Sequence, residues 1–188
     1  VNVNGFSLKL VTPPASEPVT VSEAKARLRI TISDEDADIG DMIAQARELC
    51  EAGCQRAFIT QTFSLYLDRF PGSTGDIRLP RPPLQSVSFV KYYDSAGDLQ
   101  TLDPAAYYVA TASEPGRLRP VDYWPATFCR PEAVEVRFVA GYGTAADVPA
   151  AAKAAVQLTV KALRDAPDGD LPPAARRCLD TLEFGEVR

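Results

Sequence analysis

The sequence predicts an α+β fold, with a helical module from N- and C-terminal helices and a small antiparallel β-sheet region inserted between them. Apolar residues recur every three or four positions near both ends of the chain and every second position in its middle. We therefore expect a single domain, residues 1–188. Its expected parts are N-terminal helices at 20–57, a β region at 58–145, C-terminal helices at 146–182 and a tail at 183–188.

Two helices are expected after an extended, proline-containing start. Thr20 and Glu23 have the spacing of a capping box, which predicts a short helix over 22–29. A second helix is expected from about residue 33, because acidic residues there favour a helix N-terminus. Its apolar stripe consists of Ile39, Met42, Ile43, Ala46, Leu49 and Cys50.

The excess acidity of the chain lies in this second helix. Residues 34–57 hold seven acidic and two basic side chains, and 18 of each remain elsewhere. Asp41, Gln45 and Glu48 fall on the helix face opposite the apolar stripe. We expect this acidic face to meet either a partner or a channel.

Short strands are expected in the middle of the chain. Phe63, Leu65 and Leu67 alternate with polar residues, and Val134, Val136 and Phe138 do the same. Further strands are expected around 87–93, 99–102 and 107–110, with a turn at 94–98 that makes a hairpin. The pattern predicts a small antiparallel sheet.

A long helix is expected from Asp147, as its N-cap, to about residue 164. It is apolar over most of its circumference, so it must be buried on several sides, either within the chain or between subunits. Val156, Val160 and Leu163 are therefore candidate subunit-interface residues. A last short helix is expected from Pro172.

The composition narrows the possible functions. The sequence has no histidine, so the commonest general base and the commonest zinc ligand are missing. Cys50 and Cys54 lie one turn apart but continue the apolar stripe, so we expect core packing and no metal, cofactor or catalytic site.

The net charge of −5 disfavours specific nucleic-acid binding, and no apolar run is long enough for a membrane span. The sequence starts without a signal-peptide pattern, which favours the cytoplasm.

Four segments together resemble the head–tail connector (adaptor, or head-completion) proteins of long-tailed phages and gene transfer agents. They are SEAKARLR at 22–29, TQTF at 60–63, IRLPRPPLQSV at 77–87, and FVAGYG at 138–143 followed by VPAAAK at 148–153. The resemblance extends over roughly residues 7 to 165 and rests on the order and spacing of the segments.

This resemblance implies a structural virion component that is not an enzyme. Family members form a ring, commonly dodecameric, beneath the portal in the neck of the particle. The implied partners are other copies of the chain, the portal protein and a stopper or tail-completion protein. DNA would pass through the ring without specific binding, and assembly would take place in the bacterial cytoplasm.

The candidate contact residues are Val156, Val160, Leu163, Asp41, Glu48, Arg176, Arg177 and Phe184. Phe184 lies in the C-terminal segment, which the resemblance directs toward the portal.

Two alternative functions are a small metal-dependent Asp/Glu hydrolase or nuclease, and a monomeric binding module that presents tyrosines of the sheet. These tyrosines, Tyr92, Tyr93, Tyr107 and Tyr108, are equally expected as strand packing residues.

Overall fold

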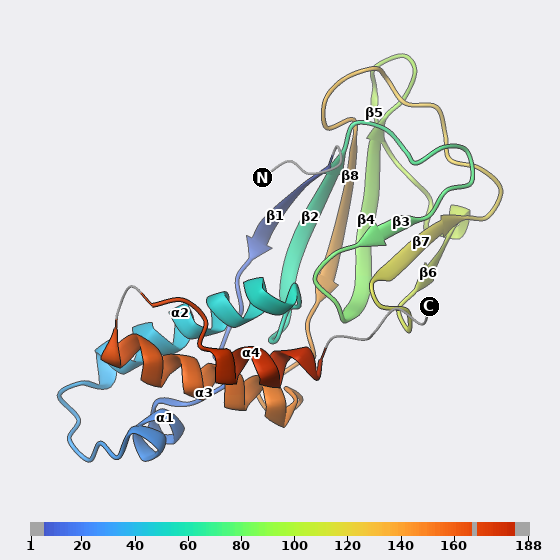
Figure 1. Cartoon of the computed structure of the whole chain (residues 1–188). Helices are drawn as coiled ribbons and strands as arrows, with labels where there is room; N and C mark the ends of the chain where they lie inside the picture. The colour runs from blue at the N-terminus through green and yellow to red at the C-terminus, as the bar shows by residue number, and fades with distance from the viewer. Residues whose placement is uncertain (1–5, 167–168, 183–188) are drawn as a thin grey trace. The chain divides into compact units, whose positions relative to one another are not determined.

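The structure is a computed structural model that describes residues 6–166 and 169–182 (Figure 1). The chain divides into two compact units, and each is described by itself. The sheet unit comprises the N-terminal segment up to Pro13 together with 60–141. The helical unit comprises 14–59 together with the chain from Tyr142 onward. The α+β class, with four helices and antiparallel sheets in the described residues, is confirmed.

The helical unit is built from two helices that lie between the first strand and the second strand of the sheet unit, and two that follow its last strand. These are α1 (Val21–Leu28), α2 (Asp36–Cys54), α3 (Ala150–Asp165) and α4 (Pro173–Asp180). Helix α2 packs against α3 and α4, and α1 packs against α2 and α3. Their shared core includes Ile39, Ile43, Ala46, Cys50, Ala152, Val156, Val160 and Leu179. No helix in the described ranges combines the length and the apolar character needed to cross a membrane.

The start of α1 has the predicted capping box. The Thr20 side chain accepts a hydrogen bond from the Glu23 backbone N–H, and the Glu23 carboxylate accepts one from the Thr20 backbone N–H at 2.7 Å. These reciprocal bonds satisfy two N–H groups at a helix start. The hydrogen bonds that the backbone N–H and the hydroxyl of Thr20 donate to the Glu23 carboxylate hold the pKa of Glu23 below its ordinary value.

The predicted N-cap of α3 is wrong. The helix begins at Ala150, with Pro149 as its N-cap. Asp147 instead accepts hydrogen bonds from the backbone N–H and hydroxyl of Thr144, at 2.8 and 2.7 Å. The carboxylate therefore closes the turn that precedes the helix. Hydrogen bonds between an Asp side chain and neighbouring residues of a turn compete with helix capping, because one carboxylate can serve either set of donors.

The sheet unit contains a five-stranded antiparallel sheet in the order β1-β2-β8-β4-β5. The strands are β1 (Phe6–Thr12), β2 (Gln61–Leu67), β4 (Leu84–Tyr93), β5 (Leu99–Thr101) and β8 (Val134–Ala140). Every second residue of the central strand β8 is buried, as its alternation predicts. The β4–β5 hairpin is also confirmed. The sheet takes in β1, which lies outside the β region that we predicted.

A second, three-stranded antiparallel sheet was not predicted. Its order is β3-β7-β6, with strands β3 (Ile77–Leu79), β6 (Tyr107–Ala110) and β7 (Gly116–Pro120), and the short 3-10 helix η1 (Pro104–Ala106) precedes β6. One face of β3 and β7 is buried through Ile77, Leu79 and Leu118. At Gly116 a side chain would collide with Leu84, whose Cδ2 lies 2.5 Å from the position of an added Cβ. Glycine therefore lets β7 lie against the first residue of β4.

Candidate interaction surfaces

A buried charge network fixes the second half of α2. Arg47 donates from Nη1 to Glu51 at 3.0 Å and from Nε to Glu17 at 2.8 Å. The other Glu51 oxygen accepts the backbone N–H of Phe58 at 2.7 Å. Burial acts to lower the pKa of Arg47, but the hydrogen bond to Glu17 and the charge of Glu51 outweigh it and raise that pKa. The network joins α2 to the segments before and after it, and sequence analysis missed it.

The outer side of α2 carries an acidic face, which we define as Asp38, Asp41 and Glu48. All three side chains are exposed, and Glu48 lies 3.4 Å from the guanidinium of its neighbour Arg47. Residues three and seven apart share one side of a helix, so the face is continuous along about three turns. The structure thus places Asp41 and Glu48 together on a solvent-facing surface, as the sequence predicts.

The three predicted interface residues of α3 are core residues. Val156, Val160 and Leu163 are at most 3% exposed within a single chain. They belong to the helical core, where α3 packs against α2 and α4. The prediction that these side chains form a subunit interface is corrected, because their apolar surface is already covered by the chain's own helices. Of the two possibilities that the sequence left open, burial within the chain accounts for them.

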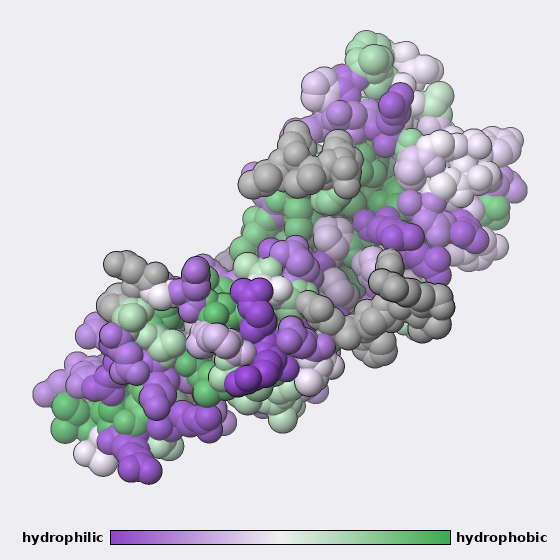
Figure 2. Space-filling view, in the orientation of Figure 1, coloured by the Kyte–Doolittle hydropathy of each residue, from purple (hydrophilic) through white to green (hydrophobic). Residues whose placement is uncertain are grey.

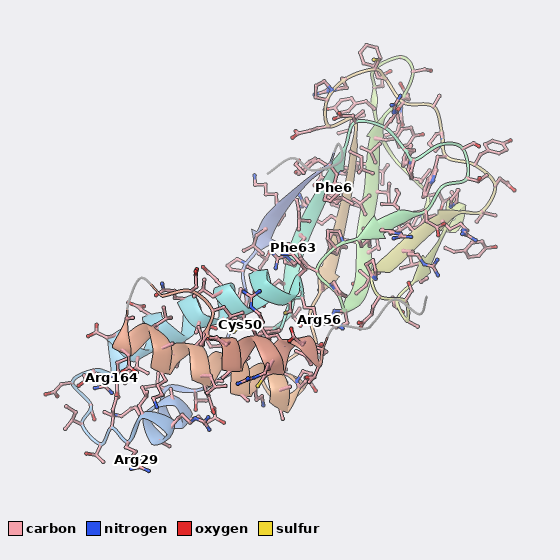
Figure 3. All side chains as sticks on the ribbon, in the orientation of Figure 1. Phe6, Arg29, Cys50, Arg56, Phe63 and Arg164 are labelled. Carbon is pink, nitrogen blue, oxygen red and sulfur yellow. The ribbon has the colours of Figure 1, made fainter. Side chains whose placement is uncertain are left out.

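The basic pair of α4 is on the surface. Arg176 and Arg177 are exposed, whereas Ala175 and Leu179 anchor the same helix in the core. Arg164, at the end of α3 (Figure 3), pairs with Glu35 at 3.1 Å. Phe184, the remaining predicted contact residue, lies outside the described residues.

The cysteines of α2 pack as small apolar side chains, as predicted. Cys50, labelled in Figure 3, lies 3.5 Å from the Thr159 hydroxyl, and Cys54 donates to the Cys50 carbonyl at 3.1 Å. Burial raises the pKa of the Cys50 thiol to about 11. A buried thiol of this kind is unreactive. Within the described ranges, no three His, Cys, Asp or Glu side chains are grouped so that they could hold a metal ion.

The four tyrosines that the sequence offers as a binding surface, Tyr92, Tyr93, Tyr107 and Tyr108, do not form one ligand surface. Tyr107 is buried, Tyr92 packs against Phe70 with ring centres 5.7 Å apart, and the Arg130 guanidinium lies 4.1 Å from the Tyr93 ring centre. Only Tyr108 among them is well exposed, at 64%. Three of the tyrosines therefore have packing partners, and the fourth belongs to a different surface.

That surface is the outer face of the three-stranded sheet, which we call the arginine face: Arg78, Arg117, Arg119 and Tyr108. The register places Arg78 opposite Arg117 and Tyr108 opposite Arg119. Asp76 accepts from Arg119 Nε at 2.6 Å and from Arg117 at 3.4 Å. Hydrophilic atoms gather over the region of β3, β6 and β7 in Figure 2. The alternation Ile77-Arg78-Leu79 and Arg117-Leu118-Arg119 was a signal for this face that sequence analysis did not use.

A groove of about 1250 Å³ borders the arginine face within the sheet unit. Its apolar lining includes Phe6, Leu65, Leu67, Phe70, Ile77 and Phe128. Asp76 and Arg78 line it as well, so the groove and the arginine face share an edge. Apolar and aromatic surface next to arginine is the composition of protein–protein contact sites.

Comparison with solved structures shows which class of protein has this fold. A chain from the neck of an empty gene transfer agent particle, computed with C6 symmetry, superposes with a TM-score of 0.80 at 21% identity, covering 97% of each chain. A chain from the neck of a native particle, computed with C12 symmetry, gives 0.77 at 20% identity, also covering 97% of each.

A chain from the virion of a native gene transfer agent particle gives a TM-score of 0.78 at 21% identity, covering 96% of this chain and 97% of the other. No family model matches the sequence, and no match is found among curated proteins. The fold is therefore that of chains from gene transfer agent particles, and it agrees with the resemblance that the sequence motifs carry.

Proposed function

We propose that this protein is a structural head–tail connector (adaptor) subunit in the neck of a tailed phage or phage-like particle. The observation that carries the proposal is the fold likeness over 97% of both chains to two neck structures. Likeness over the whole length of both chains supports a shared role better than likeness of one module. In this role the protein joins capsid to tail and is not an enzyme.

We further propose that twelve copies form a ring beneath the portal, with a stopper or tail-completion protein on the other side. The C6 and C12 symmetries of the similar neck structures support a ring. In this proposal residues 1–188 act as one connector subunit, in which the helices on either side of the β2–β8 region form one body. The ring assembles in the bacterial cytoplasm, and DNA passes through it.

The exposed acidic face of α2 supports a conduit that does not grip DNA. Carboxylates repel phosphates, so Asp41 and Glu48 would weaken contact with DNA if they lined a channel. The same side chains would contribute attraction if they met a basic partner. Contacts through Arg176 and Arg177, with the portal or the stopper as partner, are part of the same proposal.

Deletion of the gene in its host, followed by electron microscopy of the particles, tests the connector role. We expect DNA-filled or leaking capsids without tails, and normal particles after complementation with the wild-type gene. Density for this chain at the neck of complemented particles is the expected localisation. Tailed, DNA-retaining particles from the deletion strain would overturn the proposal.

The alternative of a metal-dependent hydrolase or nuclease predicts a different result. Such an enzyme would leave assembled particles intact when a single carboxylate is replaced, while its activity would be lost. Particles whose assembly depends on the chain but not on any one exposed carboxylate would favour the structural role.

A further inference from the structure

We propose that the arginine face of one copy binds the acidic face of α2 on a neighbouring copy, and that this contact joins adjacent subunits. The proposal rests on the ring role above and deepens it by naming the two surfaces. A ring requires a heterologous interface, in which one surface of a subunit meets a different surface of the next. The described part of the chain carries two surfaces of opposite charge.

The charge of the arginine face supports an acidic partner. Arg78, Arg117 and Arg119 are all exposed on one side of the small sheet. Asp76 neutralises part of this charge through its bonds to Arg119 and Arg117, which leaves an excess of two positive charges among these four side chains. Exposed arginines beside an aromatic residue are enriched among residues that dominate binding energy.

The spacing of the two surfaces also matches. Adjacent strands lie about 4.8 Å apart, so three strands span about 10 Å, close to the diameter of a helix. Along α2, Asp41 and Glu48 lie about 10.5 Å apart, since each residue adds about 1.5 Å. Arg117 and Arg119 lie about 6.7 Å apart along β7. One helix laid on the sheet therefore brings carboxylates within reach of flexible arginine side chains.

A second copy fits these observations better than DNA does. The whole chain is acidic, with a net charge of −5, and would be repelled by DNA at long range. The acidic face, by contrast, attracts the arginine face.

The test is a charge exchange in the full chain. Arg117→Glu with Arg119→Glu reverses one surface, and Asp41→Lys with Glu48→Lys reverses the other. We expect each double variant to lower ring or neck assembly by about tenfold or more, because like charges then face each other. Assembly is measured by native mass spectrometry with the portal and by counting tailed particles after complementation.

The variant with all four substitutions decides the matter. Its two reversed surfaces are again complementary, so we expect assembly to recover to within about threefold of wild type. Exposed charges that belong to neither surface serve as the control: Lys9→Glu with Asp98→Lys should leave assembly unchanged. Far-ultraviolet circular dichroism and thermal melting establish that each variant is folded. If Arg119→Glu unfolds the chain, Arg117→Gln with Tyr108→Ser probes the same face without adding an acid beside Asp76.

Several outcomes would overturn the contact while leaving the connector role intact. Normal rings from both double variants would do so, and so would two defective doubles whose combination is not rescued. Loss of binding to a duplex of about 30 base pairs by the arginine variant, with normal assembly, would assign the arginine face to DNA instead. Tailed particles without any copy of the chain would overturn the connector role itself.

Discussion

Arg47 and Glu51 form an ion pair one turn apart on α2, with 3.0 Å between Nη1 and Oε2, and both side chains are buried. Buried pairs contribute little net stability relative to apolar residues, but removing one partner leaves an uncompensated charge. In this protein Glu51 also accepts the Phe58 backbone N–H. The pair therefore sets the path of the chain as it leaves α2.

Replacement of Glu51 by alanine should lower the free energy of unfolding by about 3 kcal/mol, because the Arg47 charge stays buried and the Phe58 N–H loses its acceptor. Urea denaturation of the full chain measures the change. Glu48→Ala is the matched control, since Glu48 also contacts Arg47 but is 71% exposed. Its effect should stay below about 1 kcal/mol. If Glu51→Ala and Glu48→Ala lowered the free energy of unfolding equally, the result would contradict a stabilising role for the buried charge network.

Replacement of Val160 by alanine should destabilise the isolated chain by about 2 kcal/mol, because a core cavity forms. This variant separates a core residue from an interface residue, whose truncation would leave the isolated chain unchanged. Lys161→Ala, on the exposed side of the same helix, is the control and should change stability by less than about 0.5 kcal/mol. An unchanged denaturation midpoint for Val160→Ala would restore the interface assignment.

Replacement of Gly116 by alanine should destabilise the sheet unit by about 1–3 kcal/mol, because the new methyl group collides with Leu84. Thermal or urea denaturation measures the loss. Leu84→Ala should make the glycine replacement partly less costly, since it removes Cδ2 and Cγ of Leu84 but leaves its Cβ, 2.6 Å from the position of the added Cβ. Independent, additive effects of the two substitutions would show that Cδ2 and Cγ of Leu84 are not the cause.

Replacement of Gly40 by alanine should instead stabilise the chain by about 0.5–1 kcal/mol. Gly40 lies inside α2, and nothing lies within 4 Å of the position of an added Cβ. Alanine loses less conformational freedom than glycine when a helix forms. A lower denaturation midpoint for this variant would mean that the space beside α2 is occupied.

Replacement of Glu23 by glutamine should alter how stability depends on pH. Hydrogen bonds from Thr20 lower the pKa of Glu23 from its ordinary value of 4.5. A lowered pKa means that the folded chain favours the carboxylate, so its contribution is complete above pH 4.5 and fades as the pH falls through the lowered value. The stability difference between wild type and Glu23→Gln should therefore shrink as the pH falls below 4.5. If the stability difference between wild type and Glu23→Gln grew as the pH fell, the pKa of Glu23 would not be lowered in the folded chain.

Local patterns predicted those elements whose determinants lie close together in the sequence. Thr20 and Glu23 are three residues apart, and their capping box forms as expected. The alternation of Val134, Val136 and Phe138 produced the central strand with the expected inward side. Asp147 shows the limit of this reasoning. Its carboxylate could cap the following helix or close the turn before it, and it accepts hydrogen bonds from the backbone N–H and hydroxyl of Thr144 in that turn.

The candidate surfaces were predicted only in part. The acidic face of α2 follows from helical spacing, and Asp41 and Glu48 lie on it as expected. The arginine face was missed because β3 and β7 are separated by almost forty residues and each is too short for a strong pattern. Strands of three to five residues are specified mainly by what they pair with.

The sequence by itself determined the α+β class, the start of α1 at its capping box and the solvent side of α2, since these depend on spacings of two to seven residues. Only the tertiary structure decided that Val156, Val160 and Leu163 face the chain's own helices and that Arg78 lies opposite Arg117. The physical reason is that a periodic apolar pattern states that a face must be covered but not what covers it. Contacts between distant segments depend on how the whole chain packs, and no local spacing encodes them.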